Sequence, residues 1–393
     1  MSHVSHFCNR FESLESRTFL SASASESAHS ENKAKDVTVM TQNLYFGADL
    51  APAIAALASG DGASIVGAVS ATYAKMIATN FPERAKAIAK EIAAAKPDLI
   101  GLQEAALWRT GPADSIIGGT SPATDVQYDF VKILVDALAA KGLHYAPVVI
   151  SDGFDAEAPG VTSAGLQDIR ITDRDAILTC TDDKTSDLKL SNPVAGHFAN
   201  NLVIPLASGP FTVQRGYAEV DAKVRGKSFR FISTHLDSDV EPIRQLQAAE
   251  LLAGPVHTSL PVVLLGDFNA PADGTSPAYN SLAASLTDTW NLTHPTEDGF
   301  TWGQNELVNN PFSTADQRID FIFTHGGISA TSVDLIGDQV GDKTPSGLWP
   351  SDHAGLVATL EISNKPVVPA TPFCITHISP SSKHSDALAD LLE

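Results

Sequence analysis

Short, nearly continuous apolar runs are the feature that most constrains how this chain can fold. Four of them are LIGL (99–102), FRFIS (229–233), VVLL (262–265) and IDFIF (319–323). A strand with one face in water alternates apolar and polar residues, whereas a strand covered on both faces is apolar at nearly every position. The runs therefore predict sheets that lie between other layers of the fold.

Helical periodicity marks the segments that can cover such sheets. In RAKAIAKEIAAAK (84–96), apolar residues recur at i, i+3, i+4 and i+7, and Pro97 ends the pattern. Segment 125–141 repeats this period up to Gly142, and shorter helices are expected over 241–252 and 278–284. β-Branched and apolar runs predict strands over 35–44, 98–104, 176–181, 200–205, 211–224, 228–234, 262–265, 319–324 and 356–362.

The excess of strands over helices favours two packed sheets flanked by helices. Segments 51–81 and 111–122 interrupt this pattern as insertions, the first partly helical and the second rich in glycine and proline. Both are candidate lids over a site. At 393 residues, 43% of them hydrophobic, the chain can bury one large core or two modest ones.

The two ends of the chain differ in composition from its centre. SASASESAHSENKAK (21–35) is small and polar, with too few apolar residues to offset the entropy of ordering it. After Asn364 the chain is rich in proline and lacks sustained periodicity. We therefore expect a disordered N-terminal targeting or linker segment at 1–35, one folded domain at 36–362 and a tail at 363–393.

The N-terminal segment leaves two locations open. RFESLESRTFLSA (10–22) lacks the roughly 7–15 apolar residues of a secretory signal core. It resembles a short motif of exported bacterial proteins, Leu-Glu-Pro-Arg followed by an apolar pair and Ser-Ala, with Ser16 in place of the proline. Either the protein is exported, or the segment is a frayed terminus of a cytoplasmic protein.

Charge and cysteine content disfavour several classes of protein. Lys and Arg number 26 against 46 Asp and Glu, and the net charge of -20 disfavours a nonspecific binder of nucleic acid or anionic membranes. No run approaches the ~20 apolar residues of a membrane-spanning helix. Cys8, Cys180 and Cys374 lack the spacing of a zinc site or a disulfide framework. We expect a monomer without an obligate protein partner.

Polar side chains gather where the predicted strands meet loops. They are Asn43, Glu104, His235, Asp267, Asn269, Asp320, Asp352 and His353. Taken alone, GDFNAP (266–271) is an Asx-turn, and a lone histidine is an ordinary surface or core residue. Six such motifs in one chain instead favour one shared site, because rigid strand ends can aim groups at a ligand.

The ordered motifs QNL, LQE, STHLD, GDFN, RIDFIF and SDH resemble those of the endonuclease/exonuclease/phosphatase superfamily. That superfamily includes deoxyribonuclease-I-like enzymes, abasic-site endonucleases, neutral sphingomyelinases and inositol-polyphosphate phosphatases. The resemblance covers residues 36–362, so this segment is expected to be a catalytic domain of that kind. It implies a four-layer α/β/β/α sandwich, in which two packed mixed sheets are flanked by helices.

Phosphoester hydrolysis needs a cation that neutralises charge, an oriented water and groups that move protons. Glu104 and Asn43 offer hard oxygen ligands for Mg²⁺, with Mn²⁺ or Ca²⁺ as alternatives, and Asp352 can supply a third oxygen. Asp267 and Asn269, two residues apart, can orient the water and a phosphoryl oxygen.

Two histidines are expected to share the proton transfers. By resemblance, Asp320 and His353 form the carboxylate–imidazole dyad of the family, in which Asp320 fixes the tautomer of His353 and raises its basicity. The resemblance also places a second histidine at His235 in the nuclease and sphingomyelinase branches, whereas abasic-site endonucleases lack it. The alternative for His235 is a cap on the loop after its strand.

The segments that would select a substrate are less informative. In DRDAIL (173–178), parts of the family place a glycine or asparagine that helps to contact substrate, and this chain has Arg174 and Asp175 there. Arg174 can bind a substrate phosphate, or it can pair with Asp173 or Asp175. The sequence has neither a basic cluster interleaved with aromatic residues nor an obvious aromatic-rich hairpin.

The leading hypothesis is a divalent-metal-dependent phosphodiesterase or phosphatase that acts on nucleic acid or on a phosphorylated lipid or inositol head group. A calcineurin-like two-metal phosphoesterase is disfavoured, because its Asp-x-His and Gly-Asn-His segments are absent. From another class, the alternative is a catalytically inactive exported binding module on the same fold.

Overall fold

The computed structural model describes residues 37–115, 121–182 and 187–363. The chain separates into two units, Met1–Ala34 and Lys35–Glu393, and every element described below belongs to the second. The predicted terminal segments 1–35 and 363–393 lie outside the described residues, except for Ser363, and their assignment stays a prediction. No helix among the described residues is long and apolar enough to cross a membrane.

Two large mixed sheets form the centre of the described unit. The first contains β1 (Val37–Asn43), β2 (Leu99–Gln103), β3 (Leu107–Pro112), β4 (Asp125–Asp129), β5 (Tyr145–Thr162), β6 (Gly165–Cys180), β15 (Ile328–Ile336) and β16 (Gly355–Ile362). Its strand order is β15–β16–β1–β2–β6–β3–β4, and β5 pairs with β6 outside this path. The second contains β7 (Leu188–His197), β10 (Gly216–Val224), β11 (Lys227–His235), β12 (Val262–Asp267), β13 (Thr287–Asp288) and β14 (Asp320–His325). Its order is β13–β14–β12–β11–β10–β7.

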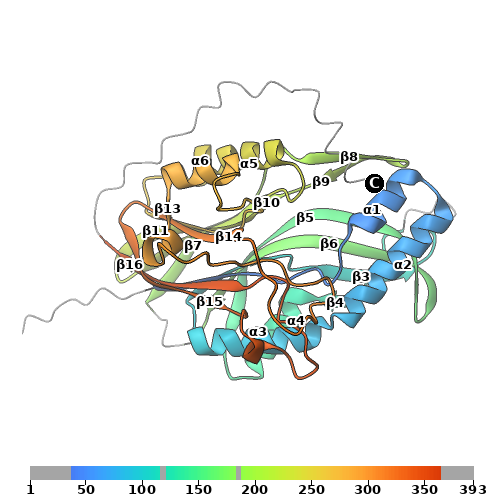
Figure 1. Cartoon of the computed structure of the whole chain (residues 1–393), viewed down its shortest axis with the longest axis horizontal. Coiled ribbons are helices and arrows are strands. Elements are labelled where there is room, and N and C mark those ends of the chain that lie inside the picture. Colours follow the sequence, from blue (N-terminus) through green and yellow to red (C-terminus); the bar gives the residue numbers. More distant parts are fainter. Residues whose placement is uncertain (1–36, 116–120, 183–186, 364–393) are drawn as a thin grey trace, which may run out of the picture. The chain divides into compact units, whose positions relative to one another are not determined.

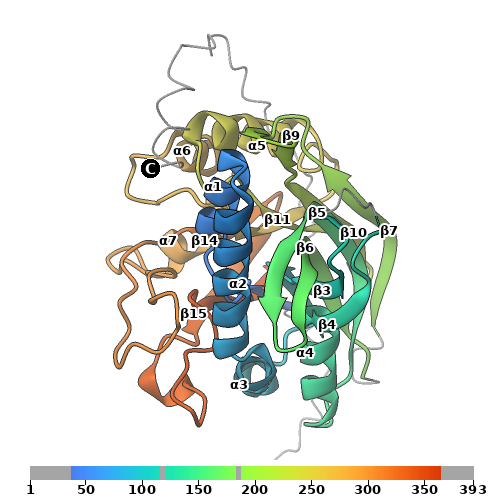
Figure 2. The same ribbon diagram turned by 90° about the vertical axis from the view of Figure 1, so that its right-hand side faces the viewer.

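Helices cover the outer face of each sheet, which gives four layers and confirms the predicted α/β/β/α sandwich. Helices α3 (Phe81–Ala95) and α4 (Phe130–Ala139) pack on the first sheet. Helices α5 (Glu241–Ala253) and α6 (Pro277–Ser285) pack on the second sheet. Figures 1 and 2 show these two helix pairs on opposite sides of the sheets. Short connections form α7 (Thr289–Thr293) and the 3₁₀ helix η3 (Val340–Asp342).

Consecutive residues of the central strands pack into different layers. In β2, Leu99 lies between the two sheets, whereas Ile100 and Leu102 face the helices. In β12, Val263 lies between the sheets, whereas Leu264 packs against the α5 and α6 layer. Because both faces of these strands are buried, apolar residues occupy nearly every position, as the runs predicted.

The predicted insertion at 51–81 is more helical than expected. It folds into α1 (Ala51–Ser59) and α2 (Gly62–Ala78). Helix α2 begins where the Asp61 side chain accepts a hydrogen bond from the Ser64 amide, and it buries Tyr73 against the first sheet. Helix α1 buries none of its residues. Only 111–115 and 121–122 of the second predicted insertion are described.

The helix predicted over 125–141 begins later than its periodicity suggested. Residues 125–129 form β4, and α4 begins after Asp129, whose side chain accepts a hydrogen bond from the Lys132 amide. Val126, placed by the periodicity on the buried face, is 58% exposed because β4 is an edge strand. The helix cap at Asp129 therefore outweighs the apolar spacing in front of it.

The strand predicted over 211–224 is two strands. The chain leaves β9 (Gly209–Val213), which pairs with β8 (Leu202–Leu206) as a separate hairpin, and then enters β10. Strands β3, β5, β7, β13 and β15 and residues 165–175 of β6 were not predicted, because polar, glycine and proline residues interrupt their apolar pattern or, in β13, because the strand is only two residues long. The long hairpin of β5 and β6 is stabilised by the pairing of its two strands, and not by the local strand propensity of its residues.

Candidate active site

Two parallel strand pairs, one in each sheet, end at the predicted site. Strands β1 and β2 are parallel, and so are β11 and β12. Asn43 ends β1 and Glu104 follows β2, while His235 and Asp267 end β11 and β12 and are register partners. Asp320, the first residue of β14, lies opposite Asp267. Strand register thus sets the spacing of five predicted residues, because a slip by one position would turn each side chain to the other face.

Asn43 links carboxylates from the two sheets. Its amide nitrogen donates hydrogen bonds to Glu104 Oε1 at 3.1 Å and to Asp267 Oδ2 at 2.9 Å. Its oxygen accepts a hydrogen bond from the Tyr45 amide at 2.8 Å, and the Phe46 amide donates to Glu104 Oε2 at 2.7 Å. In this arrangement Asn43 orients the two carboxylates, and its oxygen is turned to the backbone.

The backbone around the site takes conformations that are rare outside glycine. Glu104 and Asn269 have φ angles of 51° and 49°, in the left-handed region. Gly266 has φ 144°, and a Cβ there would lie 1.9 Å from the Thr234 carbonyl oxygen, so only glycine lets β12 pass this close to β11. Such strain costs about 1–3 kcal/mol per residue and is typical of functional sites.

Asp320 and His353 form a buried pair. His353 Nδ1 lies 2.8 Å from Asp320 Oδ2, so the carboxylate fixes Nδ1 as a protonated nitrogen. His353 Nε2 lies 3.7 Å from Asp267 Oδ2 and 3.9 Å from Asp352 Oδ1. Burial disfavours the charged imidazole, but these three carboxylates outweigh burial and hold the pKa of His353 well above its usual value.

His235 is held in the opposite way, by a guanidinium. Arg215 Nη1 lies 2.8 Å from His235 Nδ1 and 2.8 Å from Asp173 Oδ2, and all three side chains are buried. Because a guanidinium can only donate, Nδ1 of His235 is an acceptor and the proton lies on Nε2, which is 3.5 Å from Asp267 Oδ2. Burial and the charge of Arg215 hold the pKa of His235 well below its usual value.

Asp267 forms an Asx-turn and also faces the two imidazoles. Its Oδ1 accepts a hydrogen bond from the Asn269 amide at 2.9 Å, which is the turn that the sequence alone suggested. Its Oδ2 faces Asn43 and both histidines. The Asn269 side chain donates to the Leu236 carbonyl at 3.1 Å and so ties together the loops after β11 and β12. Burial and the Asp320 carboxylate raise the pKa of Asp267 to about 6.

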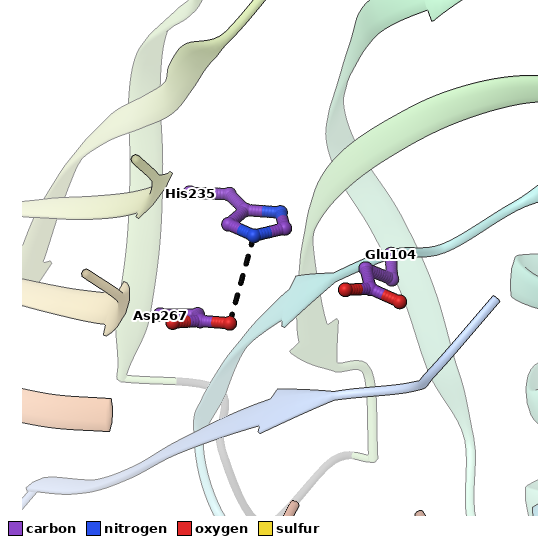
Figure 3. Close-up of side chains that lie close together, drawn as sticks. All are labelled: Glu104, His235 and Asp267. Carbon is purple, nitrogen blue, oxygen red and sulfur yellow. Dashed lines mark ion pairs between the residues drawn. The ribbon is translucent and has the colours of Figure 1, made fainter. Parts of the chain in front are cut away.

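The acid and imidazole groups fit a metal ion. Glu104, His235 and Asp267, shown in Figure 3, bring one ligand atom each within 4.8 Å of one another, and so do Asp267, Asp320 and His353. Burial and the charge of the Asp352 carboxylate raise the pKa of Glu104 to about 8. Carboxylates buried this close together are stabilised by a cation, and their oxygens suit a hard divalent ion.

A buried arginine that the sequence reasoning missed fixes two loops of the site. Arg84 of α3 is fully buried. It donates to the carbonyl oxygens of Leu44 at 2.8 Å, Tyr45 at 3.1 Å and Pro350 at 2.9 Å. One side chain therefore joins the loop after β1 to the loop that precedes His353.

Arg174 does not face the site. It is buried, its Nε donates to the Ala105 carbonyl at 2.8 Å, and its Nη2 lies 2.6 Å from Asp129 Oδ1. Its guanidinium stabilises the loop after β2. This role is neither of the two that the sequence left open, a contact to a substrate phosphate or a surface ion pair with Asp173 or Asp175. The cation beside the site is instead Arg215, which no motif marks in the sequence.

A cavity of about 640 Å³ lies over these groups. Its lining includes the predicted residues Glu104, His235, Asp267, Asn269, Asp352 and His353. Asn43 and Asp320 are buried behind this lining and reach it through their hydrogen bonds to Glu104, Asp267 and His353. The structure therefore brings all the predicted site residues except Arg174 to one place.

Two sheets between helices, with an acid and imidazole cluster at the ends of the inner strands, define the class of fold and site. Residues 40–353 match the Endonuclease/Exonuclease/phosphatase family. Because this span is most of the chain, the protein belongs to that family, which confirms the resemblance of its motifs.

Individual relatives are distant. Mouse Tyrosyl-DNA phosphodiesterase 2 is 27% identical over 174 residues, which are 42% of this chain and 45% of that protein. Rat Nocturnin is 28% identical over 166 residues, 37% of each chain, so the chain matches less than half the length of either relative. A solved endonuclease/exonuclease/phosphatase family protein from Bacteroides thetaiotaomicron has a TM-score of 0.51 at 17% identity, over 84% of this chain and 99% of that one. That structure supports the fold alone.

Proposed function

We propose that this chain hydrolyses phosphate esters with the help of a divalent metal ion. The observation that carries the proposal is the convergence of Glu104, His235, Asp267 and the Asp320–His353 pair, drawn from both sheets, at one cavity. Membership of the family supports it, and so does the phosphodiesterase among the relatives.

Glu104 and Asp352 are the residues that we assign to Mg²⁺, with Mn²⁺ or Ca²⁺ as alternatives. Both line the cavity, and the charge of Asp352 acts on Glu104. Asn43 donates a hydrogen bond to Glu104 from its amide nitrogen, and its side-chain oxygen faces the Tyr45 amide. This oxygen becomes a third metal ligand only if the side-chain amide flips, exchanging its nitrogen and oxygen. The ion would supply positive charge beside the phosphoryl oxygens.

Asp267 is placed to accept a proton from an attacking water. Its Oδ2 faces the cavity between the two imidazoles, and its pKa of about 6 lies near the working range of a general base. Asn269 lines the cavity beside it, and its anchored side chain can orient the water.

The two imidazoles differ in protonation and suit different steps. His353, charged beside Asp320, presents its Nε2 proton to the leaving-group oxygen. His235 stays neutral and donates its Nε2 proton in a hydrogen bond to a phosphoryl oxygen. Neighbouring groups with pKa values pushed in opposite directions are typical of sites that divide acid and base roles.

Hydrolysis of bis(p-nitrophenyl) phosphate and p-nitrophenyl phosphate tests the proposal for diesters and monoesters. We expect EDTA to abolish the release of p-nitrophenol and Mg²⁺ to restore it. His353→Ala should lower kcat by about 10²–10⁴-fold, the usual contribution of an acid or base. His144→Ala is the matched control, because His144 also pairs with an aspartate, Asp182 at 2.5 Å, but on the surface.

Two results would contradict the proposal. Wild-type turnover by His353→Ala would remove this histidine from the mechanism. Metal-dependent cleavage of neither ester, nor of supercoiled DNA, sphingomyelin or inositol phosphates, would favour the binding module on the same fold.

A further inference from the structure

The cavity over the candidate active site has a polar end and a long apolar end. Away from Glu104 its lining includes apolar side chains from α1, from the residue before it, and from β5, β8 and β9, among them Leu50, Ile54, Leu57, Phe154, Leu206 and Phe211. A volume of about 640 Å³ falls within the range of about 300–1,000 Å³ for small-molecule sites. One ligand can therefore occupy both ends at once.

Helix α1 is unusual because it is apolar and yet has no buried residue. Its sequence, APAIAALAS, carries no charge. Ile54 and Leu57 are only partly buried, and both line the cavity. Apolar surface left in contact with water is unfavourable by about 25 cal/mol per Å². A ligand with an apolar segment would cover this surface.

The apolar end is continuous with the reacting groups. The Phe46 amide donates to Glu104 Oε2 at 2.7 Å, and the Phe46 side chain lines the cavity. Trp108, also in the lining, donates its indole N–H to the Phe46 carbonyl at 3.2 Å. A group attached to a phosphate at Glu104 would therefore pass directly between these aromatic rings and α1.

The charges of the lining disfavour a nucleic acid strand. In the described part of the chain, the lining contains eight carboxylates and a single guanidinium, that of Arg215. A nucleic acid presents a phosphate at every nucleotide and needs a track of Lys and Arg. One phosphate held beside a metal ion, followed by an uncharged chain, needs no such track, and the two carboxylates of the lining that lie on β5, Asp155 and Glu157, are already paired with Arg170.

We infer that the substrate is a phosphate ester of a long-chain aliphatic alcohol, with its hydrocarbon chain between α1, β5 and the β8–β9 hairpin. This inference rests on the proposed function, because it places the phosphate at the metal and imidazole groups. Hydrolysis adds water across the P–O bond and releases the alcohol, or a monoalkyl phosphate if the other ester bond of a diester is cleaved.

Binding of non-hydrolysable n-alkyl phosphonic acids tests the inference without catalysis. Methyl, butyl, octyl and dodecyl phosphonic acids would be titrated by calorimetry into the protein with Mg²⁺. We expect Kd to fall up to about fourfold for each methylene that enters the cavity, and then to level off. A Kd that does not depend on chain length would overturn the inference.

A pocket-filling variant locates the chain. Ile54→Trp should shorten the chain length at which Kd levels off and reduce the preference for dodecyl over methyl phosphonic acid at least tenfold. Ile77→Trp is the matched control, because Ile77 is 46% exposed on α2 and does not line the cavity. Thermal unfolding of both variants checks their fold. Equal preferences in the wild type and both variants would also overturn the inference.

Turnover separates the two proposals. Octyl phosphate tests hydrolysis of a monoester, and methyl octyl phosphate tests hydrolysis of a diester. The kcat/KM for each octyl ester should exceed the kcat/KM for the corresponding methyl ester. Metal-dependent hydrolysis of nitrophenyl esters without any chain-length preference would refute the inference and keep the proposed function. Chain-length-dependent binding without hydrolysis of any ester would refute the proposed function, and with it the role of the alkyl phosphate as a substrate, and would leave only the apolar end as the binding site of the hydrocarbon chain. Faster cleavage of DNA than of any alkyl ester would refute the inference and indicate a nuclease.

Discussion

Glu91 should make the stability of the fold fall as the pH rises. It lies on α3, is 7% exposed, and neither of its carboxylate oxygens has a hydrogen-bond partner among the described residues. Burial, followed by the charges of Asp342 and Asp338, raises the pKa of Glu91 to about 8. The folded protein therefore keeps Glu91 protonated at neutral pH.

The sign and size of the effect follow from the two protonation states. Unfolded, Glu91 loses its proton near its ordinary pKa of 4.5, whereas folded it keeps the proton up to about pH 8. Between these values the folded state binds more protons than the unfolded state, so stability is lost as the pH rises. Each pH unit costs about 1.4 kcal/mol, and the whole shift corresponds to roughly 5 kcal/mol.

Replacing the carboxyl group by an amide removes this dependence. Urea denaturation followed by tryptophan fluorescence, from about pH 5 to about pH 8, gives the free energy of unfolding. The free energy of unfolding of Glu91→Gln, minus that of the wild type, should rise by about 1.4 kcal/mol for each unit by which the pH is raised. Glu361→Gln, at an exposed position of β16, is the matched control and should show no such slope.

A difference between Glu91→Gln and wild type that stays constant with pH would refute the reasoning. It would show that Glu91 is ionised in the folded state. If Glu91→Gln and Glu361→Gln gained stability equally with rising pH, the pH dependence would come from the net charge of the chain instead.

Three further predictions concern residues that support the site. Arg215→Met should lower kcat for bis(p-nitrophenyl) phosphate by about 10²-fold, because His235 loses the donor that fixes its tautomer; unchanged kcat would contradict this role. Gly266→Ala should lower stability in thermal unfolding by about 3 kcal/mol, because its Cβ would overlap the Thr234 carbonyl; an unchanged Tm would contradict the close approach of β12 to β11. Arg84→Met should cost about 3–5 kcal/mol in urea denaturation, because it leaves buried carbonyls without donors.

The central strands could be predicted because they are buried on both faces, and consecutive residues are therefore apolar. Leu99 to Leu102 and Val262 to Leu265 are apolar at almost every position, and each face packs against a different layer. The site residues could be located for a related reason. Each lies at or next to the end of a strand, and the pairing of these strands places the ends together.

Features that depend on tertiary pairing could not be predicted. The β5–β6 hairpin contains Pro147, Gly153 and Pro159, which locally argue against strands, and only its long pairing explains it. Arg215 carries no motif, and its role is visible only when its position directly before β10 places it beside His235. From chain position alone, Arg174 could contact a substrate phosphate or pair with Asp173 or Asp175, whereas in the structure its guanidinium turns back to the loop after β2.

The unburied helix α1 has a consequence for how this chain can acquire new preferences. The reacting groups are anchored in inner strands, whereas the walls of the apolar end come partly from a helix whose residues pack on the edge of the core and are only partly buried. Exchanging the segment 51–60 would therefore alter the wall that we propose for the alcohol while sparing the acid and imidazole groups. This separation makes α1 a natural place to retune the enzyme for a chain of different length or shape.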